Sequence, residues 1–99
     1  MADKIYKGLR MADLIVTING KKLKHIECHS PDGFEWGYGG SGPADLALSI
    51  LADFTGSKEL AYKYHQAFKW EFIANLAKEQ WKIEGKHIQE WLDIKGAEC

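Results

Sequence analysis

A stretch rich in glycine and proline, from Glu27 to Gly42, divides this chain of 99 residues into two parts with different patterns. It contains Pro31, Gly33 and four further glycines between positions 37 and 42. Glycine and proline interrupt regular secondary structure, so no long element is expected to run through it. The residues before it follow the two-residue period of strands, and those after it follow the period of helices. This segregation predicts an α+β fold.

The first part reads as strands. Residues 4–9 form a short candidate strand, and Leu14–Ile18 form a second in which alternate apolar side chains share one face. Asn19 and Gly20 follow directly, and this dipeptide tolerates the positive φ angles of a type I′ turn. We therefore predict a hairpin in which Ile18 pairs with Lys21, and residues 21–26 return as an edge strand carrying several lysines. Such lysines protect a sheet edge against pairing with other chains.

Within the dividing stretch, Phe34, Trp36 and Tyr38 alternate with Glu35 and Gly37. An extended segment would place the three rings on one face. We interpret it as a fourth strand or a rigid loop. If it is a rigid loop, it needs either hydrogen bonds to its backbone from Glu35, Ser41 or Asp32, or contacts with a partner.

Helical signals begin immediately afterwards. Gly42 and Pro43 suit a helix start, and Asp45 is expected as an acid in the first turn. An apolar stripe then continues to Phe54, and Ser57 can cap a second helix, predicted from Lys58 to about Lys78.

The last part of the chain carries Trp81 and Ile83, and then Ile88, Trp91 and Leu92 at helical spacing. These residues indicate a return segment and a short terminal helix. We expect Trp70, Trp81 and Trp91 to lie in the core. The predicted architecture is a small antiparallel sheet of three or four strands packed on one face by two long helices and a short C-terminal helix, within a single domain of residues 1–99.

Composition narrows the classes of function. The chain has 13 basic and 14 acidic residues and a net charge of −1, so electrostatics do not favour nucleic acid as a partner. No apolar run is long enough to span a bilayer, and the first residues lack the layout of a secretory signal. We therefore expect a cytoplasmic protein with no membrane partner. Cys28 and Cys99 are expected to be free thiols, because two cysteines do not make a disulfide framework.

The chain also resembles a known family. The residues that carry the likeness span nearly its whole length: the run from Gly33 to Ala47 (GFEWGYGGSGPADLA), Tyr6 and Gly8, Phe68-Lys69-Trp70, Trp81, Ile88 and Trp91-Leu92. It is similar to a family of small domains of unknown function found in bacteria, archaea, phages and other mobile elements. The resemblance implies a single-domain fold and a mobile-element setting, and it implies no ligand, activity or catalytic residue.

The glycine-rich run holds the candidate binding residues. Gly37 to Gly42 match the spacing G-x-G-x-x-G before a helix, where free N–H groups favour an anion. A dinucleotide is not expected, because a second helix follows the first where that fold needs a parallel strand. The alternative is that the glycines only permit close packing. The candidate binding residues are Glu35, Trp36, Tyr38, Gly39, Gly40, Ser41 and His29.

Two other kinds of site, a metal site and a Cys–His nucleophile, have weaker support in the sequence. His25, Cys28 and His29 form H-x-x-C-H, and His65, His87 or Cys99 could complete a metal site, but a structural zinc usually shows two paired motifs. The same cluster could supply a Cys–His nucleophile, but adjacent residues of an extended chain point to opposite faces. We therefore predict no metal and no cofactor.

Three functions follow for testing. The leading one is a non-enzymatic interaction module that binds a protein partner or a small acidic ligand, including anti-defence or accessory work for a mobile element. The second is a small hydrolase or transferase in which Glu35 and His29 share a cleft, since a carboxylate among rings can act as a general acid. The third is a single-stranded nucleic-acid binder that stacks bases on Tyr6, Trp36 and Tyr38.

Overall fold

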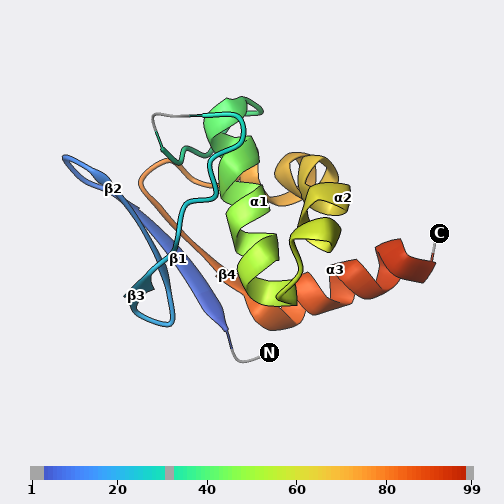
Figure 1. The fold of residues 1–99 in the computed structure, drawn as a ribbon. Coiled ribbons are helices and arrows are strands. Elements are labelled where there is room, and N and C mark those ends of the chain that lie inside the picture. Colours follow the sequence, from blue (N-terminus) through green and yellow to red (C-terminus); the bar gives the residue numbers. More distant parts are fainter. Residues whose placement is uncertain (1–3, 31–32, 98–99) are drawn as a thin grey trace.

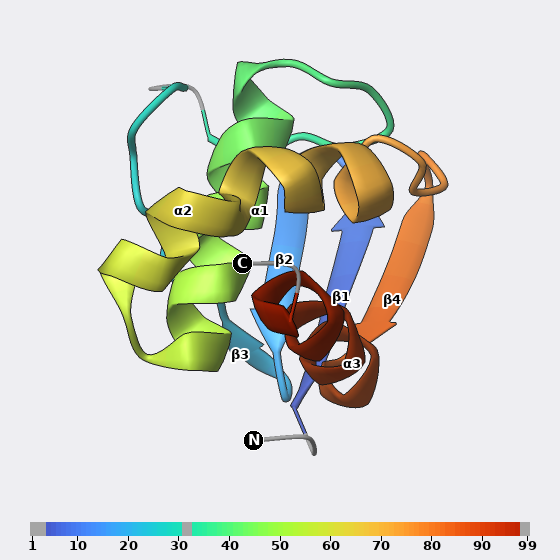
Figure 2. The same ribbon diagram turned by 90° about the vertical axis from the view of Figure 1, so that its right-hand side faces the viewer.

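The computed structural model describes residues 4–30 and 33–97, and it shows an antiparallel sheet with helices on one side (Figures 1 and 2). The strands lie in the order β3-β2-β1-β4, and their bounds are β1 Ile5–Arg10, β2 Leu14–Ile18, β3 Lys21–Lys22 and β4 Gln80–Glu84. The helices are α1 Ser41–Thr55, α2 Lys58–Phe68, the π-helix η1 Lys69–Ile73 and α3 Gly85–Ala97. The predicted α+β fold is confirmed.

The predicted hairpin is present between β2 and β3. Ile18 pairs with Lys21, and the two turn residues have positive φ angles, 49° at Asn19 and 83° at Gly20. Regular pairing ends at Lys22, although the Leu23 N–H still donates to the Val16 carbonyl at 3.0 Å. Strand β1 lies between β2 and β4 and pairs antiparallel with both, so the first predicted strand is central to the sheet.

Several predicted elements differ from the observed ones. The segment around Trp36 is a loop, and the fourth strand is β4, at the predicted return segment. The second helix changes to a π-helix at Lys69 and ends at Ile73, short of the predicted Lys78. The terminal helix α3 is longer than predicted, with 13 residues. The Ser57 hydroxyl caps α2, as predicted, by accepting the Leu60 N–H at 3.2 Å.

The core lies between the helices and the inner face of the sheet. Its largest fully buried side chains include Trp36, Tyr6, Phe54, Phe68, Leu46, Leu48 and Ile88. Trp81 and Trp91 are buried, as predicted. The prediction for Trp70 is wrong, because this side chain is 59% exposed. Phe68 and Trp70 are two positions apart, which places their side chains on roughly opposite sides of the helix, so Trp70 points away from the side on which Phe68 is buried.

Two further findings concern the cysteines and the helices. Cys28 is an exposed free thiol, and Cys99 lies outside the described residues. Across residues 4–30 and 33–97, no helix has both the length and the apolar character that crossing a membrane requires.

Candidate functional site

The glycine-rich loop is attached to the end of η1 and to the segment between η1 and β4, by its own backbone and by Trp36. The Gly37 N–H donates to the Ile73 carbonyl at 3.0 Å, and the Trp36 indole N–H donates to the Lys78 carbonyl at 2.9 Å. Gly37 has a φ of 85°, and a Cβ there would come within 2.9 Å of the Lys78 side chain. The positive φ angle therefore favours glycine at this position, whereas the flexible end of the Lys78 side chain could move aside.

Trp36 is part of the core. Its side chain has 0% exposure and meets Trp81 edge to face, with the ring centroids 5.5 Å apart. The structure therefore does not support a direct binding role for this ring. It also does not form the stacking surface proposed for single-stranded nucleic acid, because Tyr6 is buried as well and only Tyr38 of the three is exposed.

Glu35 is held by Arg10. The guanidinium makes two hydrogen bonds to the carboxylate, at 2.7 and 3.2 Å, and the Trp36 N–H donates to the same carboxylate at 3.1 Å. The hydrogen bonds from Arg10 are the main reason that the pKa of Glu35 lies below its usual value. A carboxyl group that is kept ionised in this way is a poor general acid. Its role is to fix the start of the loop against β1.

In addition to the expected hydrogen bond between the Glu35 carboxylate and the loop backbone at Trp36, Asp45 supplies further loop contacts. This fully buried carboxylate on α1 accepts the N–H of His29 at 2.8 Å, of Ser30 at 3.0 Å and of Cys28 at 3.2 Å, and it pairs with His25 Nε2 at 2.8 Å. The prediction that Asp45 is an acid of the first helical turn is therefore wrong. Asp45 is instead the group that holds residues 25–30 on α1. Asp32 lies outside the described residues.

Burial alone would raise the pKa of the Asp45 carboxyl. The hydrogen bonds from His25 and from the backbone of residues 28–30 outweigh burial, and the pKa lies below its usual value. The carboxylate is therefore charged in the folded protein at neutral pH.

His29 lies with His65 of α2 and is not bonded to Glu35. The two Nε2 atoms are 3.1 Å apart and the rings are nearly parallel. His65 Nδ1 is 2.8 Å from the Tyr62 carbonyl, which places the proton of His65 on Nδ1 and leaves Nε2 as the acceptor. His29 and Glu35 therefore have different hydrogen-bond partners. The shared cleft that the hydrolase hypothesis needs is not supported.

The remaining candidates, Tyr38, Gly39 and Gly40, lie at a surface that also includes residues missed by sequence analysis. A Cβ on Gly39 would lie 2.2 Å from the Trp70 ring, and one on Gly40 would lie 2.4 Å from the Tyr38 ring. The two exposed rings therefore pack directly on a glycine backbone, where a side chain would displace them.

Two lysines accompany these rings. The Lys69 ammonium lies 4.5 Å from the centre of the Trp70 ring, and the Lys78 ammonium lies 5.1 Å from that of Tyr38. Such contacts are favourable because the face of an aromatic ring attracts a cation. We call Tyr38, Lys69, Trp70 and Lys78 the ring–lysine platform. Sequence analysis missed Lys69 and Lys78 as members of this surface.

Ser41 is exposed at the start of α1, and the helix has no side-chain cap at Gly40. Pro43 has no N–H group, and Gly42 is buried against Glu35. The helix start thus offers fewer accessible amides than the G-x-G-x-x-G spacing suggested. It does not by itself define an anion site.

The sequence-based metal candidates do not converge. His25 is engaged by Asp45 and His29 by His65, and in the part of the chain that the structure describes no three such side chains are placed to hold a metal ion. The Cys28 thiol faces the Tyr62 hydroxyl, and this hydrogen bond raises the pKa of Tyr62.

Fold and site together define a small α+β protein with a locked glycine loop and an exposed pair of aromatic rings beside lysines. The chain belongs to the family of unknown function DUF6166, whose model matches residues 6–94. The resemblance found in the sequence is confirmed to this extent. Searches among curated proteins and among solved structures gave no match.

Proposed function

We propose that this protein is a non-enzymatic interaction module that binds an acidic segment of a partner protein at the ring–lysine platform. The main support is the environment of Lys69. This lysine is only 7% exposed, yet no carboxylate of the described residues lies within ion-pair distance of its ammonium group. Its contacts are the Trp70 ring and the Gly39 carbonyl, the latter at a long 3.4 Å. A charge so placed gains strongly from an added anion.

The exposed rings support the same proposal. Trp70 is 59% exposed and Tyr38 is 47% exposed, although both side chains are held by packing on glycine. Tryptophan and tyrosine are the residues that contribute most to protein interfaces, because they bury a large area with little loss of conformational entropy. Work as an accessory or anti-defence protein of a mobile element is the setting that the family resemblance adds to this proposal.

Rings flanked by lysines also suit single-stranded nucleic acid, which is the second candidate. It is less favoured because the chain has a net charge of −1 and its single arginine, Arg10, is engaged by Glu35. Fluorescence anisotropy with a labelled dT12 oligonucleotide at low salt decides between the two. Binding of dT12 that is lost in Trp70→Ala would favour nucleic acid over an acidic protein.

The direct test is affinity capture from a lysate of the source organism with matched variants. We expect a protein captured by the wild type to be lost with the double variant Tyr38→Ala, Trp70→Ala. It should be retained with the control Leu60→Ala, Ile94→Ala, which truncates two exposed side chains of α2 and α3. Recovery of the same proteins with both double variants would contradict the proposal. Iodide quenching of Trp70, which is the exposed tryptophan, should decrease in the complex.

A further inference from the structure

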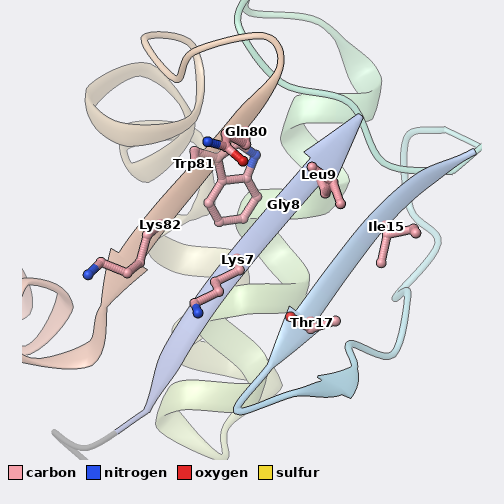
Figure 3. Close-up of a pocket in the computed structure, with 8 residues that line it drawn as sticks. All are labelled: Lys7, Gly8, Leu9, Ile15, Thr17, Gln80, Trp81 and Lys82. Atoms are coloured by element: carbon pink, nitrogen blue, oxygen red, sulfur yellow. The ribbon is translucent and has the colours of Figure 1, made fainter. Parts of the chain in front are cut away.

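The face of the sheet that points away from the helices carries a second feature, which the proposed function does not use. Strand registers place the outward residues in rows across the sheet. One row runs through Lys82, Lys7, Thr17 and Lys22, and the next runs through Gln80, Leu9 and Ile15. Figure 3 shows the residues of these rows that lie on strands β4, β1 and β2. Together with Gly8 and the Trp81 ring, they line a hollow of about 520 Å³.

The lysine row has no counter-charge. Lys7 and Lys82 are exposed and directly opposite each other on neighbouring strands, and like charges in this position destabilise a sheet. Neither forms an ion pair with a described residue. Along the outward positions of the described strands, Glu84 is the single acid, and it pairs with Ile5, one row beyond Lys82.

Protection of sheet edges does not account for this row. Lys22 lies on edge strand β3 and Lys82 on edge strand β4, where a lysine discourages pairing with other chains. Lys7 lies on β1, which is paired on both sides. Its charge protects no edge, and its position beside Lys82 costs stability.

Charge is also unevenly distributed along the chain. Residues 4–25, which form β1, β2 and β3, carry six basic side chains and one acidic side chain, Asp13. Lys4 and Arg10 are paired with Asp53 and Glu35, and the four other basic side chains are lysines. Residues 26–99 carry seven basic and twelve acidic side chains. The near-neutral net charge therefore conceals a basic region, and that region coincides with most of the open sheet face. Local field, and not net charge, decides which partner is attracted to a surface.

We propose that the open sheet face is a docking surface for an acidic, amphipathic segment of a partner protein. Its carboxylates would lie over the lysine row, and its apolar side chains over Leu9 and Ile15, which are 40% and 43% exposed. A protein segment fits better than nucleic acid, because the outward strand positions carry no aromatic side chain. The one ring that lines the hollow, that of Trp81, is only 8% exposed and offers little face on which a base could stack.

The test uses a fluorescein-labelled ten-residue peptide of alternating glutamate and valine, followed by anisotropy at low salt. We expect the double variant Lys7→Glu, Lys82→Glu to bind at least tenfold more weakly than the wild type. The control Lys58→Glu, Lys86→Glu makes the same change in net charge on α2 and α3, and its affinity should stay within twofold. Binding should weaken as salt is added.

Further measurements distinguish binding at the open sheet face from binding at the ring–lysine platform. Trp70→Ala should leave the affinity of the peptide unchanged, and loss of binding in that variant alone would overturn the sheet-face assignment. Equal losses in the two lysine double variants, no binding of the peptide, or tighter binding of dT12 would also overturn it. The single variant Lys7→Thr relieves the like-charge contact. It should raise the melting temperature of the protein and weaken the binding of the peptide. A lower melting temperature would contradict the argument.

Discussion

Replacement of Asp45 by asparagine tests the central structural claim, that one buried carboxylate holds residues 25–30 on α1. The carboxylate accepts three backbone N–H groups and contacts His25, all at 2.8 to 3.2 Å. Asparagine keeps one acceptor oxygen but turns an NH₂ group toward donors. Hydrogen bonds to a charged group contribute about 1.5–3 kcal/mol each, and unpaired buried donors add a penalty. We therefore expect a loss of about 3–5 kcal/mol, similar to breaking a buried ion pair.

Urea denaturation at pH 7 measures this loss. A chain of this size has a total stability of about 5–15 kcal/mol, so the variant loses a large part of it. With an m value of about 1–3 kcal/mol/M, the urea midpoint should fall by more than about 1 M. Asp93→Asn is the matched control, because its exposed carboxylate contacts only Gln89 among the described residues, at 2.9 Å. If both variants unfold at the same urea concentration, the role assigned to Asp45 is refuted.

Asp45→Asn should also change how the free energy of unfolding depends on pH. The pKa of Asp45 is lower in the folded protein than its usual value, so its contribution is complete above the unfolded pKa of about 3.9. It is lost as the pH falls through the lower folded pKa. Between about pH 5 and pH 2, the wild type should lose more stability than Asp45→Asn does. Parallel curves for the two proteins would show that this carboxylate is not selectively stabilised in the folded state.

Three further substitutions test the packing. Trp36→Ala should lower the free energy of unfolding by about 3–5 kcal/mol, because it empties a core position, and an unchanged urea midpoint would contradict burial of the ring. Gly8→Ala should cost about 1–3 kcal/mol, because its Cβ would lie 2.3 Å from the buried Trp81 ring; calorimetry showing an unchanged melting temperature would refute this. Tyr6→Phe removes the hydroxyl that donates to Asp53 at 2.6 Å and should cost about 1.5–3 kcal/mol in the same assay, whereas a neutral effect would make that bond dispensable.

Local patterns in the sequence were sufficient for most of the fold. The Asn19-Gly20 turn and the Ser57 cap depend on residues that are close in the chain, and each lies where it was predicted. The start of α1 was predicted at Gly42 and Pro43, and the helix begins slightly earlier, at Ser41. The end of the second helix was not predicted, because the shift to a π-helix at Lys69 has no strong local signal. From the sequence, the segment around Trp36 could be a fourth strand or a rigid loop. In the structure the fourth strand is β4, which pairs with β1.

The candidate site was predicted only in part. Glycine spacing drew attention to residues 37–42, and the structure places Tyr38, Gly39 and Gly40 at an exposed surface. The partners of these residues come from η1 and from Lys78, more than 25 positions further along the chain. Which of two tryptophans is buried also depended on such distant neighbours, because Trp36 meets Trp81 while Trp70 meets a glycine backbone.

The sequence by itself determined the order and type of the elements, because hydrophobic period and turn residues act over a few positions. Only the tertiary structure decided what each polar group bonds to. Asp45 holds a loop 15 to 20 residues before it, Arg10 neutralises Glu35, and Lys69 is left without an acid among the described residues. Such pairings depend on distances between elements that come together only on folding. They therefore cannot be read from the sequence alone.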